Sequence, residues 1–509
     1  MTAPIRMNGN TILSTNLDKV TPPAELAAVL HPDYTARYSQ WTLVRDCVEG
    51  EEAVKARKTI YLPKREKQTD TSYCADVARA VFFNATGRTL ASLLSSIFRR
   101  PGVVHLPKGI QTESVTKDGL SLRKVERWAA EEVIKVSRAG GYVELPEVEH
   151  DTPDPYLCLY PAEHILSWQV QDGVPTMVLL AEQVADTDST MNMFNTKKKW
   201  QCRLLALDEA GEYFQFVGTP EIFSSMTSLP PVAGRVYPLV YGKRLRSVPF
   251  RFFGLLKNTA EVEKPLLLDI ANVNLHHYRA SSNLERSRAF VGSPIYAVFS
   301  GSGGGSNGSE DEDELTVSPE TIWEFDKDDR AEILEFAGSG MSSLENGMEE
   351  KEEQMRVLGA RLVGQRKNAA ARSAGAETAA EASDDATLLD VVESVSDGLT
   401  ALFRIIAEWK REDPKKVSIR LNRHFSAPNL GARELRAIDA CLNRSMRPAD
   451  IFRLLQESGL IREDQDEEEY VTWIEELRAE QQAATRGDLD QSVVPKDSKP
   501  VASAGPTNS

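Results

Sequence analysis

The chain has 509 residues, enough for roughly two to four domains of about 150 residues each. Its 60 Lys and Arg against 76 Asp and Glu leave a net charge of −16, which argues against a protein that wraps nucleic acid with its whole surface. Hydrophobic residues at 41% and charged residues at 27% are ordinary globular values, which exclude collagen-like, wholly disordered and membrane classes. Residues 1–20 lack the apolar stretch of a secretory signal, so we expect synthesis in the cytoplasm and no membrane partner.

The cysteines are too widely spread for redox or zinc chemistry. The nearest two, Cys47 and Cys74, are 27 positions apart (74 − 47), which excludes a CxxC motif. We therefore expect buried free thiols at all five positions, which are Cys47, Cys74, Cys158, Cys202 and Cys441.

The first 140 residues are predicted to be mostly helical. Apolar residues recur every three or four positions over residues 33–58, the spacing of one helical face. A second helix is expected over residues 76–98, where Pro101 forbids continuation. A third begins after Ser121, a favourable N-cap, and is expected to end at the two glycines Gly140 and Gly141.

The pattern changes at Pro153 to short segments rich in aromatic and branched residues, separated by turn signals. These segments predict a mainly antiparallel sheet and hence an α+β fold class. The expected strands are residues 156–160, 165–170, 176–184, 200–207, 213–217 and 248–253.

Two helices enclosing a small island follow the sheet. The first is expected over residues 261–289, with one apolar stripe formed by Leu266, Ile270, Val273 and His277. The island, residues 290–338, has two β-like runs around a Gly/Ser/acid stretch at 300–314, whose composition predicts a mobile loop. The second helix is expected over residues 342–362.

The longest predicted helix spans residues 377–409 and carries a strict heptad stripe. Such a stripe indicates a long helix packed on other helices, and ordinary core packing is its commonest cause. The stripe residues are Leu388, Val392, Val395, Leu399, Leu402, Ile406 and Trp409. Shorter helices are expected at residues 432–442, 448–458 and 466–480, and a disordered tail over residues 481–509.

We find no catalytic motif in the sequence. It contains no P-loop and no HExxH motif, and the GxGxxG match at Gly303, Gly305 and Gly308 runs into acids instead of opening a helix. His276 and His277 are adjacent and so point about 100° apart on a helix, which does not suit a shared metal ion. We therefore predict no catalytic residues, no metal and no cofactor.

A series of segments in chain order resembles the tailed-bacteriophage portal proteins over residues 31–480. The segments are HPDYTARYSQWTLVRDCVEGEEAVK, FFNATGRTLASLLSSIFRRP, DPYLCLYPAEHILSWQV, VPFRFFG, LLLDIANVNLHHYRASSNLERSRAF, LGARLV and GAETAAEAS. The resemblance implies a non-enzymatic ring of about twelve subunits at one capsid vertex of the virion, through which double-stranded DNA enters and leaves. It also implies the terminase, scaffold, major capsid protein and tail adaptor as partners.

The resemblance implies an assignment of the parts of a portal protein to the predicted elements. It gives an N-terminal tail (1–30), a wing (31–260), a first stem helix (261–289), a clip (290–338), a second stem helix (339–360), a tunnel loop (361–376), a long helix returning to the wing (377–430), a helical crown (431–480) and a tail (481–509).

The presumed tunnel loop lies in a locally basic segment. Residues 356–376 contain five cations and no Asp or Glu, within a chain of net charge −16. Helix-end cations are the simpler explanation for Arg356 and Arg361, whereas DNA contact explains the others better. The candidate DNA-facing residues are Arg361, Gln365, Arg366, Lys367 and Arg372.

Two alternatives to a portal stay open at this stage. One is an enzyme of nucleic-acid metabolism whose active site is assembled from scattered residues. The other is a capsid-associated scaffold or adaptor that binds portals without forming the conduit. Subunit stoichiometry separates them, because the portal assignment alone requires a ring with a central hole.

Overall fold

The structure is a computed structural model and has a mixed α+β fold, as the sequence predicts. It describes residues 24–145, 154–185, 198–291, 295–299, 330–334, 340–363, 374–425, 435–436, 440, 447–457, 461, 465–476 and 479. Two compact units are present, which are described separately. The first comprises Met1–Phe98 with Val104–Leu421, and the second comprises Arg99–Val103 with Asn422–Ser509.

The first predicted helix is two helices in the structure. Helix α1 (Pro32–Glu49) ends at Gly50, and α2 (Glu51–Ala56) follows it. Gly50 has a φ of 113°, a conformation that favours glycine and interrupts the helix. On the apolar face predicted for this helix, Tyr34, Trp41 and Val44 are buried, and Tyr38 and Val48 are half-buried.

The second predicted helix is also divided, into α3 (Asp70–Arg79) and α4 (Ala85–Ile97). The side chain of Asn84 stabilises the break. Its side-chain oxygen accepts a hydrogen bond from the Gly87 N–H at 2.8 Å, which caps α4. Its amide donates to the Val48 carbonyl at 3.1 Å, which ties the cap to α1.

Helix α5 (Leu122–Val136) begins after Ser121 as predicted but ends before the two glycines. Ser137 has a φ of 56° and terminates the helix, and strand β2 (Arg138–Glu144) starts at the next residue. The sheet region therefore begins at Arg138 and not at Pro153. Gly140 and Gly141 lie in β2, where a side chain would strike Phe250 or Leu402, so these glycines allow close packing instead of stopping a helix.

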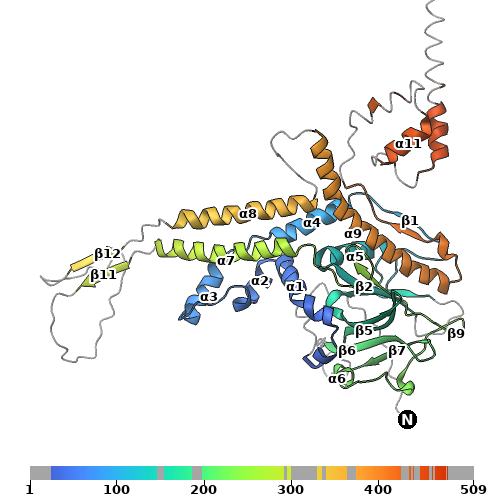
Figure 1. Cartoon of the computed structure of the whole chain (residues 1–509), viewed down its shortest axis with the longest axis horizontal. Helices are drawn as coiled ribbons and strands as arrows, with labels where there is room; N and C mark the ends of the chain where they lie inside the picture. The colour runs from blue at the N-terminus through green and yellow to red at the C-terminus, as the bar shows by residue number, and fades with distance from the viewer. Residues whose placement is uncertain are drawn as a thin grey trace, which may run out of the picture. The chain divides into compact units, whose positions relative to one another are not determined.

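The predicted strands are confirmed and form two antiparallel sheets (Figure 1). One sheet has the order β10-β2-β3, and the other has the order β4-β5-β6-β7. The bounds are β3 (Tyr156–Pro161), β4 (Ile165–Gln171), β5 (Val174–Ala185), β6 (Lys198–Leu207), β7 (Tyr213–Gly218) and β10 (Phe250–Gly254). At the β4–β5 turn, Asp172 and Gly173 have φ values of 51° and 77°, which are typical of a tight hairpin.

Short elements connect these sheets and helices. Strand β1 pairs with β13, and β8 pairs with β9. The bounds are β1 (Val103–His105), β8 (Leu239–Val240), β9 (Lys243–Arg244), β13 (Ser418–Arg420), α6 (Pro220–Ser224), η1 (Ala24–Val29), η2 (Lys58–Ile60), η3 (Ala162–His164), η4 (Val232–Gly234) and η5 (Pro414–Lys416).

Two ionic clusters are buried in this unit. Arg203 on β6 contacts Glu182 at 2.7 Å and Glu144 at 3.4 Å, so it joins the two sheets. Arg45 on α1 contacts Glu132 of α5 at 2.7 Å and Glu163 of η3 at 2.5 Å. Burial alone raises the pKa of Glu132 and of Glu182, but the neighbouring guanidinium outweighs it and leaves each pKa lowered.

Glu126 on α5 gives the fold a pH dependence. Burial raises its pKa to about 7, and nearby Arg123 opposes this only in part. The pKa of Glu126 is higher in the folded than in the unfolded state. Its contribution to the free energy of unfolding is therefore fully present below the unfolded pKa and is lost as pH rises through the folded pKa. We expect the free energy of unfolding of Glu126→Gln, relative to that of the parent, to rise by up to about 3 kcal/mol between about pH 5 and about pH 8. Urea unfolding at the two pH values measures this, and a difference that does not change with pH would contradict it.

The helices of the predicted stem and the long helix follow the sheets (Figure 1). They are α7 (Leu268–Val291), α8 (Met341–Val363) and α9 (Ala374–Trp409). Between α7 and α8, strands β11 (Ile295–Phe299) and β12 (Arg330–Leu334) pair antiparallel as a ribbon. The first predicted run of the island is thus a strand, whereas the second run and the 300–314 loop lie outside the described residues.

The second unit contains α11 (Pro448–Glu457), close to the predicted 448–458, and helical residues 467–476. Apolar side chains from both helices pack together: Ile451, Phe452, Leu455, Tyr470 and Ile474. Most of the predicted helix 432–442 and the whole tail 481–509 lie outside the described residues.

Two further expectations concern the cysteines and membranes. Cys47, Cys158 and Cys202 are buried free thiols, but Cys74 is exposed, which corrects the expectation for that residue. Cys441 lies outside the described residues. Among the described helices, none has the length and apolar character needed to cross a membrane.

Candidate functional site

Helices α7 and α8 form an antiparallel hairpin within the first unit (Figure 1). Three cross-helix contacts fix the direction. Arg288 near the end of α7 pairs with Glu345 near the start of α8 at 2.9 Å, and His277 contacts Glu352 at 3.3 Å. Further along, Gly359 lies against Ile270, since a Cβ on the glycine would be 3.7 Å from Ile270 Cδ1. The hairpin therefore brings both helix ends that flank the ribbon to one place.

The predicted stripe on α7 is only partly correct. Ile270 and His277 are buried and Val273 is half-buried, but Leu266 lies in a turn before the helix. The helix begins at Leu268 instead of at position 261, because Pro265 precedes it and has no N–H to continue an earlier turn.

A polar residue that the apolar pattern missed anchors α7. Asn274 is fully buried, and its side-chain oxygen accepts a hydrogen bond from the Thr86 hydroxyl at 2.9 Å. Its amide donates to the Phe83 carbonyl at 2.7 Å. Asn274 thus holds α7 against the start of α4. Helical spacing offered no signal for it, because an asparagine is normally assigned to the exposed face.

His277 is a packing residue in the described part of the chain. Its ring lies 6.0 Å from that of Phe83, and only 3% of its side chain is exposed. Nε2 faces Glu352, while Nδ1 has no hydrogen-bond partner among the described residues. Adjacent His276 is exposed. The two rings are therefore in different environments, as their spacing predicts.

All seven residues of the heptad stripe of α9 are buried. The stripe packs on β10, β2, α5 and β13 of its own chain. At its centre Gly398 lies so close to Phe253 that a Cβ would be 2.5 Å from the ring. The stripe is therefore covered by the chain itself.

The junction between α8 and α9 is shorter than the expected 361–376 loop. Helix α8 continues through Arg361 to Val363, and α9 already begins at Ala374. Arg356, the first cation of the basic segment, is exposed and pairs with Glu353 one turn earlier. The other candidate DNA-facing residues, Gln365, Arg366, Lys367 and Arg372, lie outside the described residues, so the structure does not place them.

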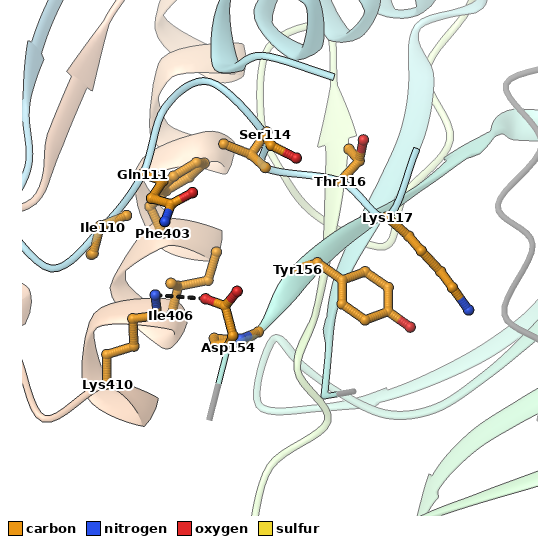
Figure 2. Close-up of a pocket in the computed structure, with 12 residues that line it drawn as sticks. Ile110, Gln111, Ser114, Thr116, Lys117, Asp154, Tyr156, Phe403, Ile406 and Lys410 are labelled. Carbon is orange, nitrogen blue, oxygen red and sulfur yellow. Dashed lines mark ion pairs between the residues drawn. The ribbon is translucent and has the colours of Figure 1, made fainter. Parts of the chain in front are cut away.

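One cavity of about 440 Å³ lies between the 110–117 loop, the start of β3 and α9 (Figure 2). Asp154 and Lys410 form an ion pair at 2.7 Å across part of its wall, and Lys410 also donates to the Gly109 carbonyl at 3.1 Å. Lys117 and Tyr156 add a cation and a phenol. This lining suits binding of a polar group, but it holds no histidine or cysteine for acid–base or nucleophilic work.

Metal-binding geometry does not occur within the described ranges. Among those residues no group of three or more His, Cys, Asp and Glu side chains is placed to hold a metal ion. The glycine-rich GxGxxG match lies outside the ranges.

Comparisons with known proteins give one family match and several weak structural similarities. Residues 265–410 match a domain of unknown function, DUF4055, which is less than half of the chain and spans α7, the ribbon, α8 and α9. A comparison with curated protein sequences found no match.

Three similar solved structures are particles of a gene transfer agent (GTA). A chain of the "Neck of native GTA particle computed with C12 symmetry" has 10% identity, a TM-score of 0.38, and coverage of 73% of this chain and 89% of that one. A chain of the "Neck of empty GTA particle computed with C6 symmetry" has 10% identity, a TM-score of 0.36, and coverage of 76% and 93%. One in the "Virion of native gene transfer agent (GTA) particle" has 10% identity, a TM-score of 0.35, and coverage of 82% and 97%. These scores are low, so no function follows from them.

Proposed function

We propose that this chain is a portal-type structural subunit that forms a closed ring and conducts double-stranded DNA through one vertex of a phage-like capsid. One observation carries the proposal. The hairpin of α7 and α8 carries the β11–β12 ribbon at one end. At the other end the chain continues into α9 through residues 356–376, which contain five cations and no Asp or Glu. This arrangement matches the stem, clip and tunnel-loop order implied by the resemblance of the sequence.

In this proposal each part of the first unit has a distinct task. The sheets and helices α1 to α5 form the wing, whose buried ionic clusters keep the two sheets and the helices in register. The hairpin α7–α8 is the stem, and Asn274 fixes it to α4. The ribbon β11–β12 is the clip, which docks the packaging motor or the tail adaptor. The second unit belongs to the crown.

The DNA-facing part is the basic segment at the α8–α9 junction. Long cationic side chains reach phosphate oxygens without reading bases, so their contacts are transient and independent of sequence. The remainder of the chain is acidic, with a net charge of −16 overall, which keeps DNA from being gripped along the channel. The competing assignment, an enzyme with a scattered active site, needs convergent catalytic groups. The described cavity offers the ion pair of Asp154 with Lys410 together with Lys117 and Tyr156, and its lining contains no histidine or cysteine.

Native mass measurement tests the ring directly. We expect the purified full-length chain at micromolar concentration and moderate salt to give a closed oligomer of about twelve subunits with a central hole in negative stain. Head-to-tail contacts that do not close would give filaments instead. A monomer alone under these conditions would overturn the proposal.

A further inference from the structure

A strongly basic surface lies beside the middle of helix α7. Residues 55–67, which we name the basic lobe, contain six cations and one acid, Glu66, within an acidic chain. The lobe comprises the end of α2, the short helix η2 and the loop that follows. Its cations are Lys55, Arg57, Lys58, Lys64, Arg65 and Lys67.

The lobe is a firmly held platform. Arg57 pairs with Asp46 of α1 at 2.7 Å, and the Tyr61 hydroxyl donates to the same carboxylate at 2.5 Å. Arg65 pairs with Asp76 of α3 at 2.7 Å. These contacts use some cations internally and fix the backbone between them. A surface whose backbone is already ordered loses little entropy when a partner binds.

Two cations and one apolar side chain of the lobe remain available. Lys58 and Lys67 are exposed and make no ion pair with any residue that the structure describes. Between them, Ile60 is 68% exposed, the highest value among the large apolar residues of the described chain. An exposed apolar residue flanked by unpaired charges is typical of an interface anchor.

Helix α8 presents the complementary pattern. Glu349 and Glu350 are exposed and make no ion pair within the described ranges, and Glu353 lies one turn further along. Val357 follows at the next turn and is 40% exposed. We name these four residues the α8 acidic face. Like the lobe, this face combines an apolar residue with charges, here of the opposite sign, although Arg356 neutralises part of Glu353.

The two surfaces lie on opposite sides of α7. Arg279 of α7 donates to the Tyr61 carbonyl of the lobe at 2.6 Å, whereas His277 of α7 contacts Glu352 of α8. Residues two positions apart on a helix point about 200° apart, so these contacts leave α7 in nearly opposite directions. Figure 1 shows α2 and α3 on one side of α7 and α8 on the other. One chain therefore cannot bring its own lobe onto its own acidic face.

We propose that the basic lobe of one copy docks on the α8 acidic face of a second copy of this chain, with Ile60 and Val357 as apolar anchors. Contact between two different surfaces on opposite sides of one element is head-to-tail, and its repetition gives a ring when the rotation between copies closes. This inference rests on the proposed ring function and assigns the surfaces that build the ring. Nucleic acid is the competing occupant of a basic lobe, and the experiment below separates the two.

Paired charge reversals test the docking. One variant carries Lys58→Glu with Lys67→Glu, and the other carries Glu349→Lys with Glu350→Lys. Each gives the unpaired charges of its own two surfaces the same sign, so we expect each alone to raise the concentration needed for assembly by about tenfold or more. A control with Glu113→Lys and Asp118→Lys, two exposed acids on the 110–117 side of the chain, should assemble like the parent.

Mixing the two reversed variants provides the decisive readout. In an equal mixture each reversed lobe can meet a reversed α8 face and each unchanged lobe an unchanged face, so we expect rings to return. Recovery also shows that both variants are folded. Native mass and negative stain detect the rings, and raised salt should weaken parental assembly.

The outcomes separate this inference from the ring proposal. Parental rings with no recovery in the mixture would overturn the docking and leave the ring intact. A parent that never forms rings would overturn the ring itself. If Lys58→Glu with Lys67→Glu assembles normally but loses retention of a short DNA duplex, the lobe binds nucleic acid and the docking is wrong.

Discussion

Replacing Arg203 with methionine is expected to lower the free energy of unfolding by about 3–5 kcal/mol. Arg203 is 3% exposed and is the only cation paired with Glu182 among the described ion pairs; it also contacts Glu144 and donates to Gln215 at 2.8 Å. Removing it leaves two carboxylates between the sheets without a counter-charge. An unpaired buried charge destabilises far more than the pair itself stabilises.

The pH dependence of this loss identifies its cause. In the parent the Arg203 guanidinium keeps the pKa of Glu182 lowered against the effect of burial, so the contribution of the pair is present above the unfolded pKa. It is lost as pH falls through the lowered folded pKa. Denaturant unfolding should therefore show the largest difference near neutral pH and a smaller one in acid.

A matched exposed pair serves as the control for Arg203. Arg244 pairs with Glu212 at the surface, and Arg244→Met is expected to change the unfolding free energy by less than about 1 kcal/mol. If both methionine variants unfold at the same denaturant concentration, the inter-sheet cluster does not hold the wing together.

The second large effect concerns DNA. Arg366→Glu with Lys367→Glu is expected to leave ring assembly intact and to lower the fraction of DNA-filled heads by about tenfold or more. Each subunit changes from two positive to two negative charges at the α8–α9 junction, and ring symmetry multiplies that change around the channel. Phosphates passing the junction would then meet repulsion instead of transient attraction.

An adjacent pair of exposed lysines offers the matched control for this charge change. Lys415→Glu with Lys416→Glu makes the same four-unit change in η5, beyond the end of α9, and should package normally. Packaged length and retention in filled heads are the measurements. Full-length DNA packaged at the parental rate by the Arg366/Lys367 variant would show that this segment does not face DNA.

Short-range sequence patterns predicted the positions of the strands correctly. Each expected strand from 156–160 to 248–253 is present, because alternating apolar residues and turn residues such as Asp172 and Gly173 act over short distances. Helix boundaries were less accurate. The break before α4 depends on Asn84 reaching Val48 of another helix, which spacing alone does not reveal.

The wrong interpretation of Gly140 and Gly141 has a related cause. Two glycines after a helical pattern usually indicate a helix end, but here they lie in a strand because Phe250 and Leu402 pack against their backbone. Both neighbours are more than a hundred positions away along the chain (250 − 140 = 110). No local window contains that information.

The sequence predicted some buried residues of the candidate site and missed others, for a physical reason. Apolar periodicity found all of the α9 stripe, since those residues are buried by their own hydrophobicity. It missed Asn274 and Arg203, which are buried because of partners distant in sequence. Their pairing satisfies groups that would otherwise be expensive to bury, and residue type alone assigns such groups to the surface.

The hairpin α7–α8 also has a mechanical consequence. The burial of α8 is concentrated toward its end, where Met355 is buried and Gly359 lies against Thr89 of α4, while the half of α8 that leads to the ribbon has no buried residue among those described. The half of α8 next to the ribbon is thus held by fewer buried contacts than the half that contains Met355 and Gly359. The 14 residues from Met341 to Met355 span about 21 Å at about 1.5 Å per residue, so a tilt of about 5° at Met355 displaces the start of α8 by about 2 Å. A small repacking around Met355 is thereby amplified at the end of α8 that leads to the ribbon.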